Sequence, residues 1–74
     1  MSRLPRVTGA ELARALGQVG FKVKRIRGSH HFLEHPDGRT TVVPVHPRET
    51  IGPGLMSKIL RDVEVCREEL VALL

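Results

Sequence analysis

Two short histidine-containing motifs hold the side chains that could carry out proton-transfer chemistry. The first is Gly28-Ser29-His30-His31, and the second is Pro44-Val45-His46-Pro47. Histidine can both accept and donate a proton near neutral pH. A basic stretch precedes the first motif, and basic side chains attract the phosphates of a nucleic acid. Together the two features suggest chemistry on nucleic acid. The residues of the basic stretch are Lys22, Lys24, Arg25 and Arg27.

The positive charge is concentrated in the first two thirds of the chain. The formal net charge is +4. Residues 1–48 carry nine basic and three acidic residues and all four histidines, whereas residues 49–74 carry three basic and five acidic residues. This asymmetry favours an anionic partner for residues 1–48. A basic surface that serves only solubility is the other interpretation.

Length and composition indicate one small domain of 74 residues with an aliphatic core, because Phe21 and Phe32 are its only aromatic residues. A domain of this size buries only about 60% of its unfolded surface, so a partner or a homo-oligomer would help to stabilise it. The single cysteine, Cys66, excludes an intrachain disulfide and fits a reducing cytoplasm. No apolar run follows Arg3 and Arg6, so we expect no signal peptide and no membrane span.

Local patterns predict the helix that precedes the basic stretch. Thr8 and Glu11 have the spacing of a capping box, in which each residue satisfies a backbone N–H near the helix start. Apolar residues then recur at helical spacing. Gly20 is suited to end the helix in a left-handed conformation. We therefore expect a helix over residues 8–19.

Three strands are expected to follow. Phe21 and Val23 alternate with lysines, as in a half-buried strand over residues 21–27. Ile26 is out of phase with them, so either a bulge lies near residues 24–25 or the strand ends there. Strands over residues 30–35 and 40–45 flank a tight turn at Pro36-Asp37-Gly38. Pro44 places the third strand at an edge of the sheet or stops it.

Helical patterns return in the last third of the chain. Gly52-Pro53-Gly54 should begin a second helix, with Leu55, Ile59 and Val63 on its apolar side. Residues 65–74 are apolar enough for a short terminal helix with Glu68 and Glu69 outward. The order of elements predicts a two-layer α+β domain with the helices on one face of the sheet.

His30 and His31 cannot act as one unit if they lie in a strand, since adjacent side chains point to opposite faces. The sequence leaves open which histidine is exposed, because each face also carries one large apolar residue. Both histidines could simply be polar surface residues. Gly28 favours a functional role because it lets a substrate backbone come close, and the Ser29 hydroxyl can donate to a phosphate. For His46 we favour a substrate contact or a loop residue over a second catalytic group.

Other chemistry is less well supported. The histidine spacing matches no closed metal site, although imidazole suits zinc and copper. A Ser29 nucleophile activated by His30 is not favoured, because no third residue of a catalytic triad is evident and sequence neighbours are poorly placed for the required hydrogen bond. Cys66 lies in the acidic part of the chain and is expected to be a bystander. We therefore expect no metal and no cofactor.

The chain resembles the HicA-type toxins of prokaryotic toxin–antitoxin pairs. The similarity rests on a first helix ending near Gly20-Phe21, the basic strand, both histidine motifs, and Ile51-Gly52-Pro53-Gly54-Leu55 at the start of the second helix. It covers residues 8 to about 63 of a single domain, 1–74, and leaves a helical tail over residues 64–74. The family often has an aromatic residue at the position of Leu33, whereas here Phe32 precedes it.

This resemblance implies a fold like that of the double-stranded-RNA-binding domain, with the order α-β-β-β-α and a three-stranded antiparallel sheet. It implies an endoribonuclease that cuts messenger RNA and arrests translation, and a HicB-type antitoxin that covers the active site. The catalytic histidine of the family follows the Gly-Ser pair. His30 is the direct match, and His31 is a second candidate.

The expected mechanism is metal-independent cleavage with the RNA 2′-hydroxyl as nucleophile, so that DNA is not cut. His30 would be the general base or acid, and Ser29 would stabilise charge on the phosphorane. The competing hypotheses are a double-stranded-RNA-binding module that never cleaves and a small subunit that acts only through its partner. The residues expected to bind RNA are Gly28, Ser29, His46 and the basic residues Lys22, Lys24, Arg25 and Arg27.

Overall fold

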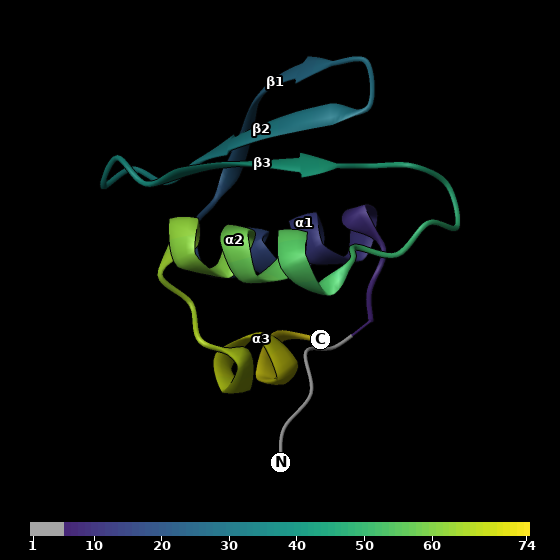
Figure 1. Cartoon of the computed structure of the whole chain (residues 1–74). Helices are drawn as coiled ribbons and strands as arrows, with labels where there is room; N and C mark the ends of the chain where they lie inside the picture. Colours follow the sequence, from purple (N-terminus) through teal and green to yellow (C-terminus); the bar gives the residue numbers. More distant parts are fainter. Residues whose placement is uncertain (1–5) are drawn as a thin grey trace.

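A computed structural model describes residues 6–74; Arg3, one of the nine basic residues of the first part, lies outside the described residues. The predicted order of elements is confirmed (Figure 1). The elements are α1 (Gly9–Gly17), β1 (Lys22–Arg27), β2 (His30–Glu34), β3 (Thr40–Pro44), α2 (Pro53–Val63) and α3 (Arg67–Leu73). The fold is therefore the expected α+β arrangement.

The three strands form one antiparallel sheet in the order β1-β2-β3. Helices α1 and α2 lie on one face of the sheet, and α3 lies on the far side of these two helices from the sheet (Figure 1). We call the sheet face that points away from the helices the open face. The core extends from the sheet past α1 and α2 to α3, and it is aliphatic apart from one aromatic ring. Its members include Leu12, Leu16, Phe21, Leu33, Val43, Met56, Ile59, Val63 and Leu70.

Helix α1 begins as predicted but ends at Gly17, two residues before the expected end, and a turn over residues 18–20 follows. The Thr8 N–H donates to Glu11 Oε1 at 2.8 Å, and the Glu11 N–H donates to Thr8 Oγ1 at 3.2 Å. The hydrogen bond from the Thr8 backbone lowers the pKa of the Glu11 carboxyl. Gly20 has a φ of +102°, a value that favours glycine, and it turns the chain so that Phe21 enters the core.

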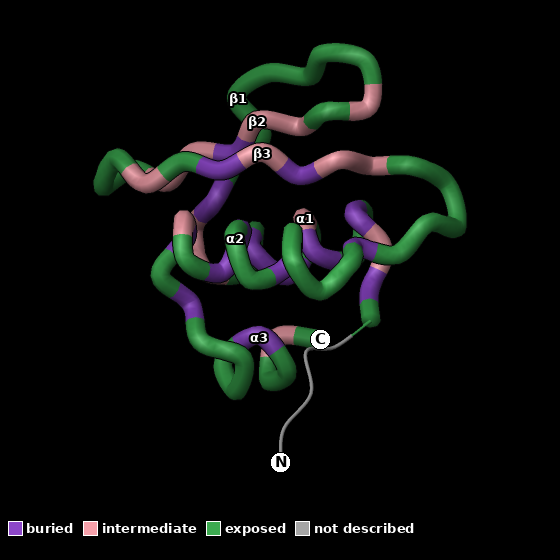
Figure 2. The backbone as a smooth tube through the Cα atoms, viewed as in Figure 1, coloured by how far each residue is buried: buried purple, intermediate pink, exposed green. Residues whose placement is uncertain are grey.

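Of the two possibilities for β1, a bulge or a strand end, the bulge is observed, because the register with β2 shifts between Val23 and Arg25. The prediction that this strand is half-buried is wrong. All six residues of β1 are exposed, including Val23 at 49% and Ile26 at 55% (Figure 2). The physical reason is that α1 and α2 pack against β3, at the opposite edge of the sheet, so the apolar side of β1 projects beyond them.

Helix α2 begins at Pro53 as predicted, and two of its three predicted apolar positions, Ile59 and Val63, are buried, but Leu55 is not. Leu55 is 37% exposed, whereas Met56, Ile59, Leu60 and Val63 are buried. The buried positions follow the i, i+3, i+4, i+7 spacing of one helix face, and residue 55 falls outside it. The terminal helix α3 is confirmed, with Glu68 and Glu69 exposed.

The turn between β2 and β3 is tied to the end of α2 by Arg39. Its Nε lies 2.9 Å from Asp37 Oδ2, its guanidinium lies over the Phe21 ring at 5.2 Å, and its Nη1 donates to the carbonyl of Val63. The hydrogen bonds from Arg39 lower the pKa of Asp37. His35 packs edge-on against Phe21 with ring centroids 5.1 Å apart. The side chain of His35 therefore packs against a core residue and lies away from the two histidine motifs.

Candidate active site

The structure separates the two adjacent histidines of β2. His31 lies opposite Val43, which is fully buried, and alternation places it on the same face as the buried Leu33. His31 therefore lies on the sheet face that packs against the helices, where it is half-buried. His30 lies opposite Pro44 on the open face and is exposed. A general acid or base must reach its substrate, and His30 has the more accessible position.

The two histidine motifs meet at one end of the sheet. The Val45 N–H donates to the carbonyl of Ser29 at 2.7 Å, and Ser29 Oγ lies 3.2 Å from His46 Nε2. The side chain of Val45 packs against the core on the helix side. Residues before a proline favour an extended backbone, and in that conformation the His46 side chain would point opposite to that of Val45, toward the face that carries His30.

A glycine makes the short connection between β1 and β2 possible. Gly28 and Ser29 are the only residues between the paired Arg27 and His30. Gly28 has a φ of +57°, which glycine adopts without the strain that a side chain would add. A Cβ at Gly28 would have no atom within 4 Å, so the space beside this backbone is open. The turn thus brings Ser29 and His30 to an accessible edge.

The basic stretch flanks these groups on the open face. Arg27 is paired with His30, Arg25 with Phe32, and Lys22 with Glu34, and directly opposite residues share a face. The bulge places Lys24 beside the same strand, where its Nζ lies 3.3 Å from Glu34 Oε1. All four basic side chains are exposed. They form a positive border along β1 beside His30.

One site contact involves Gly9, which the sequence analysis did not single out. Gly9, the first residue of α1, packs against the end of β3, and a Cβ there would lie 2.0 Å from the Pro44 carbonyl oxygen. This close approach holds the segment that leads to His46. A glycine directly after the N-cap residue Thr8 is a weak signal, since its partner comes from 35 residues further along the chain.

The remaining candidates lie elsewhere. Cys66 is exposed and directly precedes α3. Among the described residues, no three His, Cys, Asp or Glu side chains come together in a group that could hold a metal ion. The gathered groups are thus two imidazoles, one hydroxyl and the basic border. Such a set can transfer protons and bind phosphates.

The sequence profile of a known family matches residues 9–65, more than three quarters of the chain. That family is described as the HicA toxin of bacterial toxin–antitoxin systems. The chain belongs to the HicA toxin family. It is the toxin component of a toxin–antitoxin pair, and the family implies an antitoxin protein as its partner. A search of curated proteins finds no match.

The HicA match includes both histidine motifs, the bulged β1 and α2, and it ends before α3. The residues that meet at the candidate site therefore all lie inside the family region. None of the helices in residues 6–74 is long and apolar enough to cross a membrane.

Proposed function

We propose that this HicA toxin is an endoribonuclease that cuts messenger RNA and so arrests translation. The observation that carries the proposal is the contact between Ser29 and His46 beside the exposed His30, within a basic border. Two imidazoles and a hydroxyl at one accessible edge are suited to proton transfer at a phosphodiester. The proposed reaction is transesterification by the 2′-hydroxyl of the RNA.

In this mechanism His30 removes the proton from the 2′-hydroxyl. The 2′-oxygen forms a bond to the adjacent phosphorus, and the bond from phosphorus to the 5′-oxygen of the next nucleotide breaks. The products are a 2′,3′-cyclic phosphate and a 5′-hydroxyl, which receives the proton that His30 removed. The chemistry needs no metal ion, and DNA lacks the nucleophile.

The other groups bind and stabilise. Arg27, which lies opposite His30, is placed to bind the phosphate next to the reacting bond. The Ser29 hydroxyl donates to charge that develops on the phosphorane, while its oxygen accepts from His46 in the tautomer that carries the proton on Nε2. Because such donors are already oriented, they stabilise the transition state without further reorganisation. Lys22, Lys24 and Arg25 extend the phosphate-binding border.

The antitoxin is proposed to be a HicB-type protein that covers this site. A partner of the open face must match its positive border, so it should present acidic groups there. Electrostatic attraction then accelerates association and makes it sensitive to salt. An association rate that does not change with ionic strength would contradict this geometry.

The test of the proposed reaction is product analysis on an RNA and its all-DNA copy in the presence of EDTA. We expect cleavage of the RNA alone, with 2′,3′-cyclic phosphate and 5′-hydroxyl ends identified by mass spectrometry. Cleavage of the DNA copy, or ends that carry a 5′-phosphate, would contradict the mechanism. Binding of duplex RNA without any cleavage would instead support a double-stranded-RNA-binding module, which the α-β-β-β-α order would also suit.

A further inference from the structure

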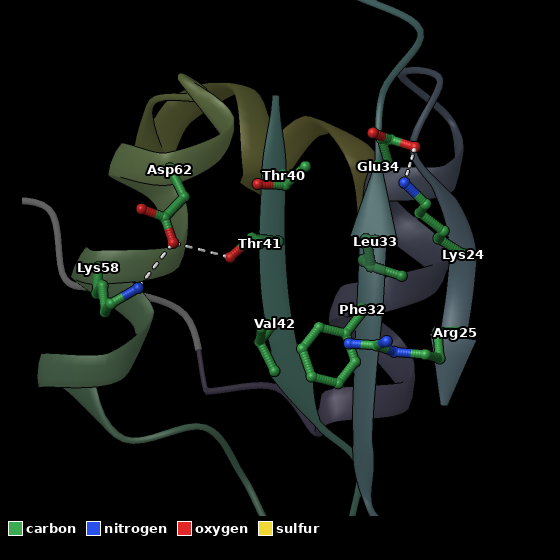
Figure 3. A pocket seen from close by; sticks show the side chains of 10 residues that line it. All are labelled: Lys24, Arg25, Phe32, Leu33, Glu34, Thr40, Thr41, Val42, Lys58 and Asp62. Atoms are coloured by element: carbon green, nitrogen blue, oxygen red, sulfur yellow. Dashed lines mark hydrogen bonds and ion pairs between the residues drawn. The ribbon is translucent and has the colours of Figure 1, made fainter. Parts of the chain in front are cut away.

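A groove next to the candidate active site spans the open face of the sheet and its β3 edge, where α2 borders it. It has a volume of about 630 Å³ and is bordered by side chains from all three strands and from α2 (Figure 3). None of the helices within residues 6–74 packs on this face (Figure 1). Phe32 and Val42 lie opposite each other on neighbouring strands, and Lys24 and Glu34 lie further along the sheet (Figure 3).

Phe32 is the unusual feature of this groove. The other phenylalanine of the chain, Phe21, is 3% exposed and belongs to the core. Phe32 instead lies on the open face, where it makes no part of the core and is half-buried. The guanidinium of Arg25, from the neighbouring strand, lies 4.8 Å from the centre of its ring. Because the guanidinium lies over the ring, the two planar groups form a stacked platform at the surface.

Such a platform has the chemistry of a nucleobase site. Proteins that recognise unpaired RNA stack its bases on aromatic rings and on arginine guanidinium planes. The groove also offers hydrogen-bonding groups for the edge of a base, namely the Glu34 carboxylate and the Thr40 hydroxyl. Its surroundings suit the attached phosphates, since the basic residues Lys22, Lys24, Arg25, Arg27 and Lys58 outnumber the acidic Glu34 and Asp62.

The platform is correctly placed for a nucleotide that neighbours the reacting bond. Phe32 follows His30 by two positions on the same strand, so both side chains share the open face at a spacing of roughly 6.6 Å. We infer that Phe32 and Arg25 form a stacking site for an unpaired base next to the cleaved bond, with purines preferred for their larger stacking area. The inference rests on the proposed function, because it specifies single-stranded RNA as the substrate.

A binding experiment tests this site separately from catalysis. The probe is a short 2′-O-methyl RNA that contains the fluorescent purine 2-aminopurine and cannot be cut, because its 2′-oxygens are blocked. Stacking quenches this fluorescence. We expect quenching by the wild type, at least about tenfold weaker binding by Phe32→Leu, and retained binding by Phe32→Trp. Val23→Ala is the matched control, since Val23 is an exposed apolar residue whose partner Leu33 places it on the other face.

The outcomes distinguish the stacking site from the proposed reaction. Equal affinities of Phe32→Leu and Val23→Ala, or equal binding of the probe in a duplex, would overturn the stacking site even if natural RNA is cut. Binding that depends on Phe32, together with no cleavage of natural RNA, would support the site and contradict the ribonuclease. Loss of antitoxin binding alone in Phe32→Leu would assign the groove to protein contact and overturn the inference.

Discussion

The Gly9→Ala substitution should disturb both the stability of the domain and its candidate active site. The added Cβ would lie 2.0 Å from the Pro44 carbonyl oxygen, 2.9 Å from the Pro44 carbonyl carbon and 3.0 Å from Val45 Cα. Ordinary contact begins at 3.4 Å, so α1 and the end of β3 must separate by about 1.4 Å. All three atoms belong to the backbone and cannot move aside as a flexible side chain would.

The expected loss follows from this overlap. Overpacking of this kind costs about 1–3 kcal/mol. A domain of this size loses roughly 4–8 °C of Tm for each kcal/mol. The end of β3 continues into His46, so the displacement should also lower the cleavage rate of the folded protein. A shift of about 1 Å can cost about a hundredfold in rate.

Gly17→Ala is the matched control, because it makes the same change at the other end of α1. A Cβ at Gly17 has no atom within 4 Å. Replacing a helical glycine by alanine there should stabilise the domain by up to about 1 kcal/mol. Urea unfolding followed by circular dichroism measures both variants. The reasoning is refuted if Gly9→Ala is as stable as Gly17→Ala.

Three further predictions concern the turn network, the carboxylates and the second histidine motif. Arg39→Gln removes a charge-assisted hydrogen bond to a carbonyl at the end of α2, and a loss of about 1–2 kcal/mol in urea unfolding is expected; an unchanged midpoint would contradict the role of this contact. The pKa values of Asp62 and Asp37 are lowered from the ordinary 3.8 by hydrogen bonds from Lys58 and Arg39, so these carboxylates add stability above that ordinary pKa. This stability should be lost as the pH falls through the lowered pKa values. Unfolding midpoints at several pH values check this, and Asp62→Asn should flatten the profile. His46→Ala should slow RNA cleavage about 10- to 100-fold while the protein stays folded, and an unchanged rate would make His46 a plain loop residue.

Structural features that depend on a few neighbouring residues could be predicted from the sequence. The capping box at Thr8 and Glu11, the turn at Pro36-Asp37-Gly38 and the bulge near Lys24 each depend on local spacing or chemistry. The exposure of β1 could not be foreseen in the same way. Whether Val23 is buried depends on where the helices pack against the sheet, and periodicity within the strand carries no information on that.

The candidate site was predicted in part. Both histidine motifs were found, but the faces of His30 and His31 stayed open because the alternation places one large apolar residue on each side. In the structure Leu33 is buried in the core, so His31 lies on the helix side and His30 lies on the open face. The contact of Ser29 with His46 could have been predicted from the sequence. The tight turn sets the pairing of β2 with β3 and places His30 opposite Pro44, so the residues next to this pair come close together. The close packing of Gly9 against Pro44 could not be predicted, because nothing in the sequence near either residue indicates that they come together in the fold.

The most direct test of the central claim compares cleavage of an unstructured RNA by the wild type, His30→Ala and His31→Ala in EDTA. Circular dichroism and unfolding curves establish that each variant is folded. We predict that His30→Ala lowers the rate by about 10²- to 10⁴-fold, because it removes the proposed proton-transfer group. His31→Ala, which changes a half-buried side chain on the helix side, should stay within about tenfold of the wild type. No cleavage by the wild type, or a loss confined to His31→Ala, would contradict the account.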